Sequence, residues 1–269
     1  MNCLDFEYDG QRLSDYGCVM GLLNGVPDGQ SPSGADIQFS QGQGSNRDIF
    51  DLYDTYYEEP YIVTFTICKD PCKNATQEDM YFTPREISHI QRWLCRRDGY
   101  HKFKIDQDEY RDLYWMGVFQ SQQITLAGYC IGFALTLTTN APYAFYEDVT
   151  LNIGHEDCSN FTVYSLCDEE GYITPNIIIK VLEAGDLTIT NSRDTKDMVI
   201  TNCRANETIT IDGSHLIIST TSTSHDLGTC FNYYFPKLFN TYNNTKNDYT
   251  CNLSCDITFS YAPIIKIGL

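Results

Sequence analysis

The cysteines and histidines with short spacings are the first residues of this sequence that could do chemistry. Three pairs have spacings within reach of metal ligation: His155 with Cys158, Cys68 with Cys72, and Cys251 with Cys255. A structural zinc site usually shows paired short spacings with turn residues between them. Cys251 and Cys255 instead fall two pleats apart on one face of a predicted strand. We therefore interpret these cysteines as core residues and predict no metal site.

The motifs of the common enzyme active sites are absent from the sequence. It contains no Gly-x-Ser-x-Gly turn, His-Glu-x-x-His helix, phosphate loop or dinucleotide fingerprint, and Gly42 and Gly44 are only two glycines in a polar loop. A glycosidase-like carboxylate pair cannot be singled out, because the candidates stand in loops, where acidic residues are usually solvated. These candidates are Glu156, Asp157, Asp168, Glu169 and Glu170. We predict no catalytic residue and no cofactor.

The chain has 12 cysteines, an even number that is typical of a disulfide framework in a small secreted protein. With 269 residues the chain is not small, and its first residues show no basic stretch followed by an apolar run. No window approaches the apolar length of a membrane span. We expect folding in a reducing cytoplasm with most thiols free and buried, and no membrane insertion. The five Asn-x-Ser/Thr triplets then have no role in glycosylation.

The formal charge of -18 is spread along the chain and indicates a solvated acidic surface. Binding to a phosphate backbone requires clustered Lys and Arg. The one basic cluster, Arg92, Arg96 and Arg97, stands at the end of a predicted helix, where cations suit the helix dipole. We expect no specific binding of nucleic acid.

The elements of the first half are mostly strands, consistent with 20 Tyr and 14 Phe in the chain. We predict strands over residues 4–8 and 18–23, then a long hairpin or loop over residues 24–47 with a short strand at residues 37–39. The dense apolar run at residues 61–68 predicts a central strand in the core. Strands over residues 110–120 and 123–138 follow, with Ser121 and Gln122 between them.

One helix is predicted, beginning with Thr83 as N-cap, Pro84 at the first helical position and Glu86 placed to reach back to the cap amide. Ile87, Ile90 and Leu94 form its apolar face with Trp93 beside it, and the helix should end near Gly99. This pattern is typical of a surface helix lying on a sheet.

The second half contains no helical periodicity, and we place a domain boundary after Tyr146, giving domains 1–146 and 147–269. Its short runs are separated by Gly, Asn and Asp and predict a β-sandwich or jelly roll. The predicted strands cover residues 149–153, 162–165, 176–181, 186–190, 197–200, 207–211, 215–220 and 251–261.

The order of several strand and turn patterns resembles the siphophage distal tail protein family over nearly the whole chain. In the first half these patterns are residues 6–10, 14–17, 92–94 and 138–144. In the second half they are residues 187–191, 207–213, 231–238 and 257–261. No single pattern is specific, and the resemblance rests on their joint order.

The resemblance implies a mainly β protein with two domains. The first would be an N-terminal β-sandwich with one flanking α-helix, related to tail-tube proteins, and the second a galectin-like C-terminal β-sandwich or jelly roll. In some family members the last strand returns to the first domain, which the apolar residues 264–267 could do here.

The resemblance also implies a structural role in the virion tail, assembled in the bacterial host cytoplasm. Copies would form a homo-hexameric ring, a baseplate hub that joins the tail tube protein to the tail-tip (tail-associated) protein and the receptor-binding proteins. DNA would pass through the ring without specific binding, which net acidity favours. The chain would not be an enzyme. Neither the 12 cysteines nor residues 24–47 are explained by the family pattern.

Two alternatives remain at this point. The first is a tail-tube or other baseplate protein, although a tube protein normally lacks a large second β domain. The second is a carbohydrate-binding module or glycosidase-associated β-sandwich, suggested by Tyr233, Tyr234, Phe235 and Tyr242. Aromatic residues in strands are more often core residues than sugar platforms.

Overall fold

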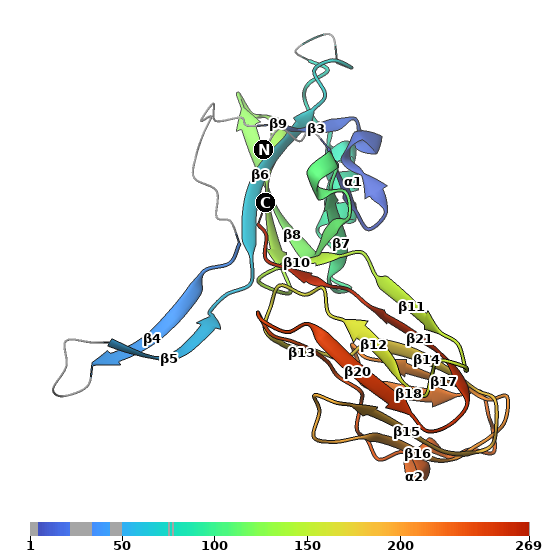
Figure 1. Ribbon diagram of the computed structural model, residues 1–269. Coiled ribbons are helices and arrows are strands. Elements are labelled where there is room, and N and C mark those ends of the chain that lie inside the picture. Colours follow the sequence, from blue (N-terminus) through green and yellow to red (C-terminus); the bar gives the residue numbers. More distant parts are fainter. Residues whose placement is uncertain (1–4, 22–33, 44–49, 75, 77, 269) are drawn as a thin grey trace. The chain divides into compact units, whose positions relative to one another are not determined.

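The computed structural model describes the chain except for residues 1–4, 22–33, 44–49, 75, 77 and 269 (Figure 1). The chain divides into two compact units: unit 1 comprises residues 1–145 and 266–269, and unit 2 comprises residues 146–265. Strands dominate both units, so the predicted mainly β fold class is confirmed. The sequence predicted a domain boundary after Tyr146, and the first segment of unit 1 ends one residue earlier, at Phe145.

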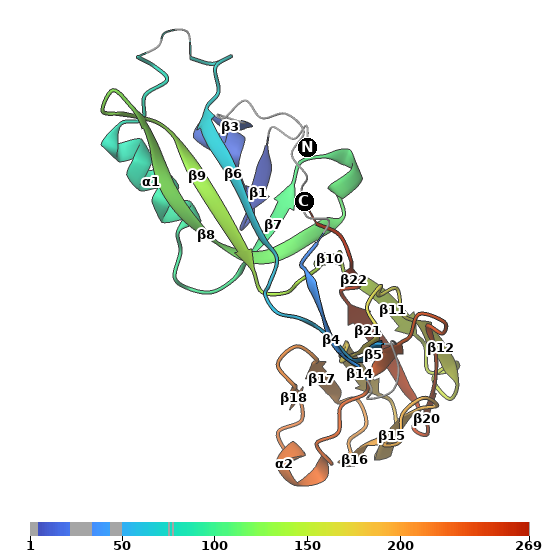
Figure 2. The ribbon, with the colours of Figure 1, turned by 90° about the vertical axis from the view of Figure 1, so that its left-hand side faces the viewer.

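Unit 1 is built on a large antiparallel sheet with the strand order β2-β1-β7-β8-β9-β6-β3. Figure 2 shows β8, β9, β6 and β3 side by side. The strands are β1 (Phe6–Tyr8), β2 (Gln11–Arg12), β3 (Cys18–Gly21), β6 (Ile62–Lys69), β7 (His101–Ile105), β8 (Leu113–Leu126) and β9 (Tyr129–Thr139). Two short 3-10 helices (Leu13–Tyr16 and Asp108–Tyr110) lie between strands. Two further short strands, β10 (Ala144–Tyr146) and β22 (Ile264–Ile265), pair with each other.

Helix α1 (Pro84–Leu94) begins as the sequence predicted. The Thr83 hydroxyl accepts from the Glu86 amide, and the Glu86 carboxylate accepts from the Thr83 amide at 2.7 Å, which completes a capping box. The helix ends at Leu94, five residues before the predicted end at Gly99, because Cys95 leaves the helical region with φ -89 and ψ 57.

The sequence predicted that the whole basic cluster lies at the end of the helix. Because the helix ends early, only part of the cluster does. Only Arg92 stands in the last helical turn. Arg96 follows the helix and is held by ion pairs to Asp9 and Asp98. Arg96 therefore forms local structural contacts.

The helix packs on the sheet through aromatic side chains. Trp93 is 4% exposed, stacks on Tyr16 with ring centroids 4.3 Å apart, and donates its indole N–H to the carbonyl of Tyr8 at 3.0 Å. Phe6 is fully buried, and its ring also stacks with that of Trp93, with the ring centroids 5.7 Å apart. The predicted role of Trp93 as the anchor of the helix agrees with these contacts.

Two strand expectations for unit 1 were wrong. The break between strands was expected at Ser121 and Gln122, but these residues continue β8 and pair with β9. The turn between β8 and β9 lies at Ala127 and Gly128, both of which have positive φ. Strand β6 is not a buried central strand: Ile67 is its one buried residue, and Ile62 is 45% exposed. The reason is that β6 has one inward and one outward face: Phe65 packs edge-on against Phe6 at 5.6 Å, while Ile62 and Thr64 are exposed.

Unit 1 also contains an antiparallel hairpin of β4 (Ile37–Gln43) and β5 (Phe50–Tyr57) (Figure 1). The short strand expected at residues 37–39 is longer, and β5 was not predicted at all. Parts of the expected strand at residues 18–23 and of the segment 24–47 lie outside the described residues.

Unit 2 is a β-sandwich of two antiparallel sheets. One sheet has the order β11-β21-β14-β17-β18 and the other β12-β20-β15-β16. Phe161 of the second sheet lies 5.6 Å from Phe259 of the first, ring centroid to centroid, so the inner faces pack on each other. The first sheet comprises β11 (Val149–Ile153), β14 (Asn176–Val181), β17 (Thr208–Asp212), β18 (Ile217–Thr220) and β21 (Cys255–Tyr261), and the second β12 (Phe161–Tyr164), β15 (Gly185–Asn191), β16 (Met198–Cys203) and β20 (Lys246–Cys251).

Smaller elements complete unit 2, and the sequence had not predicted them. They are the strand pair β13 (Gly171–Ile173) with β19 (Leu238–Asn240) and the short helix α2 (Leu227–Cys230).

The prediction of one strand over residues 251–261 was wrong. Strand β20 ends at Cys251 in one sheet and β21 begins at Cys255 in the other, so residues 252–254 cross between the sheets. The connection from β11 to β12 crosses between the same sheets. Cys251 and Cys255 therefore do not share one face of one strand. The strand geometry that spoke against a ligand pair in the sequence does not apply to them.

Candidate functional site

The β4–β5 hairpin is the clearest candidate for a binding surface. It pairs with no other strand in the part of the chain that is described, and forms a two-stranded sheet of its own. Six large apolar or aromatic side chains on it are between 42% and 67% exposed. They are Ile37, Phe39, Phe50, Leu52, Tyr53 and Tyr56, and we call them the hairpin surface.

An isolated hairpin of this kind is only marginally stable in water. Exposed apolar surface of this kind often marks a site of interaction with another molecule. The hairpin also has local structure of its own: a bulge follows Ser40, and the Tyr53 ring lies over Gly42, where a Cβ would come within 2.4 Å of Cε2. The hairpin surface is thus a shaped surface suited to contact with another chain.

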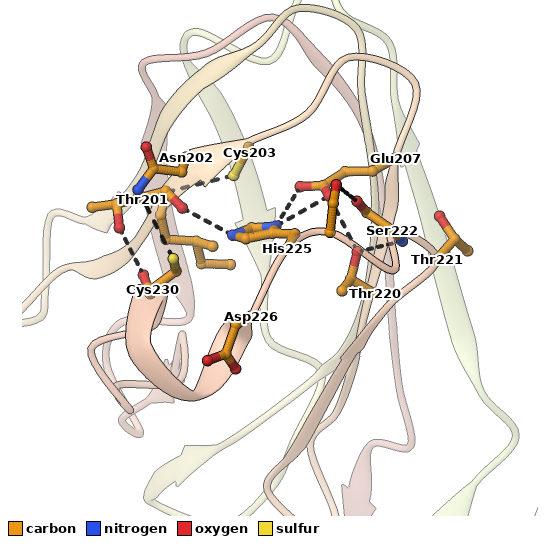
Figure 3. Close-up of polar contacts among 12 residues, drawn as sticks. Thr201, Asn202, Cys203, Glu207, Thr220, Thr221, Ser222, His225, Asp226 and Cys230 are labelled. Atoms are coloured by element: carbon orange, nitrogen blue, oxygen red, sulfur yellow. Dashed lines mark hydrogen bonds and ion pairs between the residues drawn. The ribbon is translucent and has the colours of Figure 1, made fainter.

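A buried pair of titratable side chains, His225 and Glu207, lies in unit 2 (Figure 3). Their side chains are 1% and 2% exposed, and Nδ1 of His225 lies 2.9 Å from Oε1 of Glu207. The Glu207 carboxylate also accepts from the Thr220 hydroxyl at 3.2 Å. Nε2 of His225 lies 2.9 Å from the carbonyl oxygen of Thr201.

This pair is arranged for structure and not for catalysis. A carbonyl oxygen only accepts hydrogen bonds, so Nε2 of His225 carries the proton and donates it to Thr201. In a nucleophilic triad that nitrogen would instead face a hydroxyl or thiol. The pair ties the loop before α2 to β16 and to the start of β17, and a buried titratable pair with every polar atom bonded is a stable arrangement.

Three buried thiols meet in unit 2: Cys158, Cys251 and Cys255. Their sulfur atoms all lie within 4.8 Å of one another, and the Sγ atoms of Cys251 and Cys255 are 3.4 Å apart. Cys158 comes from the connection between β11 and β12, and the other two flank the crossing from β20 to β21. The side chains are 3%, 5% and 0% exposed, respectively.

The surroundings of the thiols are mostly backbone carbonyls. The Cys158 thiol donates to the carbonyl of His155 at 3.2 Å and lies 3.6 Å from that of Leu253, and Cys251 donates to Leu253 at 3.3 Å. A hydrogen bond from Cys255 lowers the pKa of Cys251. The same hydrogen bond, with burial, raises the pKa of Cys255.

The other residues singled out in the sequence do not gather into a site. Cys68 is half-buried and Cys72 exposed in unit 1, outside the thiol cluster, and His155 pairs with Asp256 at 3.3 Å. Most of the loop carboxylates are exposed, as expected for solvated acidic residues; these are Glu156, Asp157, Asp168 and Glu170, while Glu169 is half-buried.

The aromatic residues considered for a sugar platform have separate partners. Tyr234 donates its hydroxyl to Asp194 at 2.6 Å, and Phe235 packs edge-on against Phe231 at 5.2 Å. Tyr233 and Tyr242 are 67% and 66% exposed. This arrangement gives no support to a shared stacking surface for a sugar ring.

Sequence reasoning missed the hairpin surface, the His225–Glu207 pair and the thiol cluster. The cluster had one usable signal: Asn252 and Ser254, polar residues typical of turns, stand between Cys251 and Cys255. Cys158 is 93 residues earlier than Cys251, so only the fold brings it to the pair.

Comparison with known proteins places the chain in a family. Residues 1–141 match the model described as a phage tail protein N-terminal domain, and residues 143–261 match a phage tail C-terminal domain. The chain belongs to this family of phage tail proteins. No helix in the described part is long and apolar enough to cross a membrane.

Among solved structures, the chain shares its fold with the Dit (gp 19.1) protein of phage SPP1, described as a paradigm of the hub adsorption apparatus in phages that infect Gram-positive bacteria. The identity is 13%, the TM-score is 0.68, and the match covers 96% of this chain and 98% of that chain. The resemblance to distal tail proteins predicted from the sequence is thereby confirmed at the level of the fold.

A chain of the phage P2 baseplate, in its activated conformation with calcium, matches with a TM-score of 0.45 and 7% identity, over 97% of this chain and 98% of that chain. No curated protein matches the sequence significantly.

Proposed function

We propose that this phage tail protein is a distal tail protein: a hub whose copies form a hexameric ring at the end of the tail tube and carry the tail-tip and receptor-binding proteins. The observation that carries the proposal is the hairpin surface on a chain with the fold of SPP1 Dit. A closed ring requires two different surfaces on each subunit. An exposed hairpin that pairs only with itself is suited to be one of them.

The proposed role is structural and not enzymatic. The His225–Glu207 pair has both ring nitrogens bonded to the protein, with no nucleophile on them. The net charge of -18 supports a channel through which DNA passes without binding, because like charges repel.

The experiment is a measurement of the oligomeric state of the full chain by sedimentation velocity and negative-stain microscopy. We expect rings of six subunits in the parent. The double variant Phe39→Ser, Leu52→Ser should lower the ring fraction at least tenfold at equal concentration while leaving the far-ultraviolet circular dichroism unchanged. The matched control is Leu166→Ser, which removes a side chain of the same exposure, 55%, from a loop of unit 2.

Two outcomes would contradict the proposal. A parent that stays monomeric at high concentration, also in the presence of tail tube protein, would exclude a ring-forming hub. Rings that persist in the hairpin variant but dissociate in the control would place the subunit contact elsewhere.

A further inference from the structure

We propose that Cys158, Cys251 and Cys255 form a binding site for a thiophilic metal ion, with Zn²⁺ as the ion to test. Thiolate sulfur is the ligand that zinc prefers in structural sites. Three thiols within 4.8 Å of one another offer that ligand from two separate segments of the chain. Neither the assembly role proposed above nor the family match assigns a role to these residues.

The distances between the sulfur atoms fit a shared ion. With Zn–S bonds of about 2.3 Å, tetrahedral geometry places neighbouring sulfurs about 3.8 Å apart. The Cys251–Cys255 separation of 3.4 Å lies below this value and the 4.8 Å limit of the cluster above it. Each sulfur therefore needs a displacement of less than about 1 Å, which side-chain torsions can supply.

The position of the site in the fold gives the ion a structural role. Cys158 stands on the connection from β11 to β12, and Cys251 and Cys255 flank the connection from β20 to β21. Both connections cross between the two sheets of the sandwich. The His155 amide donates to the Asp256 carboxylate at 3.0 Å and already ties the same two segments together. A bound ion would fix this end of the sandwich by crosslinking them.

Three thiolates are the ligands that the described part of the chain offers. Among the described residues no further His, Cys, Asp or Glu belongs to the cluster. On binding, the thiols give up their three protons to solvent and the metal–sulfur bonds replace the hydrogen bonds to the Leu253 and His155 carbonyls. No electron is transferred in this step.

The main alternative is a set of ordinary core thiols, and a second is a disulfide between Cys251 and Cys255. Buried cysteines often act as small apolar side chains. What distinguishes this cluster is that three sulfurs meet. The Cys203 thiol, equally buried in the same unit, donates to the Ile200 carbonyl at 3.5 Å and belongs to no such group of ligands among the described residues. Cys203 therefore supplies a matched control.

The first experiment uses the unmodified full chain, purified with reductant from zinc-supplemented cells. Elemental analysis after extensive dialysis should find about one zinc per chain. Replacement of zinc by Co²⁺ should give the sulfur-to-cobalt charge-transfer absorption that only thiolate ligands produce. Removal of the ion by a chelator should lower the melting temperature of the protein, and re-addition of zinc should restore it.

The second experiment compares Cys251→Ala with Cys203→Ala in the full chain. We expect at least tenfold weaker zinc binding in Cys251→Ala and unchanged binding in Cys203→Ala. Should Cys251→Ala fail to fold, the cobalt spectrum of the parent still decides the question, because it needs no variant.

Three results would overturn the proposal. They are a reduced parent that takes up neither zinc nor cobalt, cobalt spectra that show oxygen ligands alone, and equal metal binding by the two variants. A Cys251–Cys255 disulfide found by mass spectrometry in metal-free protein purified with reductant would also overturn it. None of these results bears on the ring, so the site and the hub proposal are tested separately.

Discussion

Replacement of Trp93 by alanine should destabilise unit 1 by about 3–5 kcal/mol, the usual range for an emptied aromatic core site. Trp93 is 4% exposed, and its ring is stacked on Tyr16 and Phe6. Each aromatic pair contributes about 0.5–1.5 kcal/mol beyond the buried area. The substitution also removes the donor that the Tyr8 carbonyl accepts, which puts the expected loss toward the upper part of the range.

The assay is urea unfolding followed by tryptophan fluorescence and by circular dichroism. Both tryptophans of the chain, Trp93 and Trp115, lie in unit 1, so fluorescence reports that unit alone. In Trp93→Ala the fully buried Trp115 remains as the reporter. Circular dichroism follows both units, and the transition of unit 2 should not move.

Two variants test the separate contributions. Trp93→Phe keeps an aromatic ring but removes the N–H, and should cost about 1–3 kcal/mol, the range for a buried acceptor left without its donor. Arg92→Ala changes the exposed neighbour on the same helix and should stay within about 0.5 kcal/mol of the parent. A Trp93→Ala variant as stable as Arg92→Ala, or one that shifts the unit 2 transition instead, would refute the packing argument.

Three further predictions concern the thiols, the dependence of stability on pH, and the two halves of the chain. Thiol titration under denaturant should find most of the 12 cysteines reduced in protein from a bacterial cytoplasm; finding most of them paired would contradict this. Burial raises the pKa of the Cys18 and Cys203 thiols from 9.0 to about 12, so the folded state binds their protons more tightly than the unfolded state. Stability should therefore be full below pH 9 and fall as pH rises toward 12, as measured by denaturant melts, and Cys18→Ala should show a shallower fall. Residues 1–146, supplied with a peptide of residues 264–269, should form rings while residues 147–269 stay monomeric; sedimentation showing the reverse would overturn the assignment of the ring to the first half.

Local signals in the sequence were sufficient for the start of α1. Thr83, Pro84 and Glu86 act on the first helical turn alone, and no distant contact is needed to place them. The end of the helix was misplaced because Arg96 is held by Asp9, which is 87 residues away in the sequence. The hairpin strand β5 was missed because its alternation of apolar and polar residues lasts only from Phe50 to Leu52 and breaks at Tyr53.

The single strand predicted over residues 251–261 shows the limit of periodicity more clearly. Every second residue from Cys251 to Tyr261 is buried, including Leu253 in the crossing between the sheets. Alternation with a period of two therefore continues unbroken through a segment that leaves one sheet and joins the other. The pattern reports which side chains are buried, but it does not report how many strands carry them.

The discontinuity of unit 1 has a consequence for how the protein is made. Residues 266–269 belong to unit 1, although all of unit 2 precedes them in the chain. During translation the ribosome therefore releases the last part of unit 1 only after unit 2 has been synthesised. A nascent chain that has not yet reached residue 266 holds an incomplete first unit, so the order of synthesis itself delays the completion of unit 1 until unit 2 has been made.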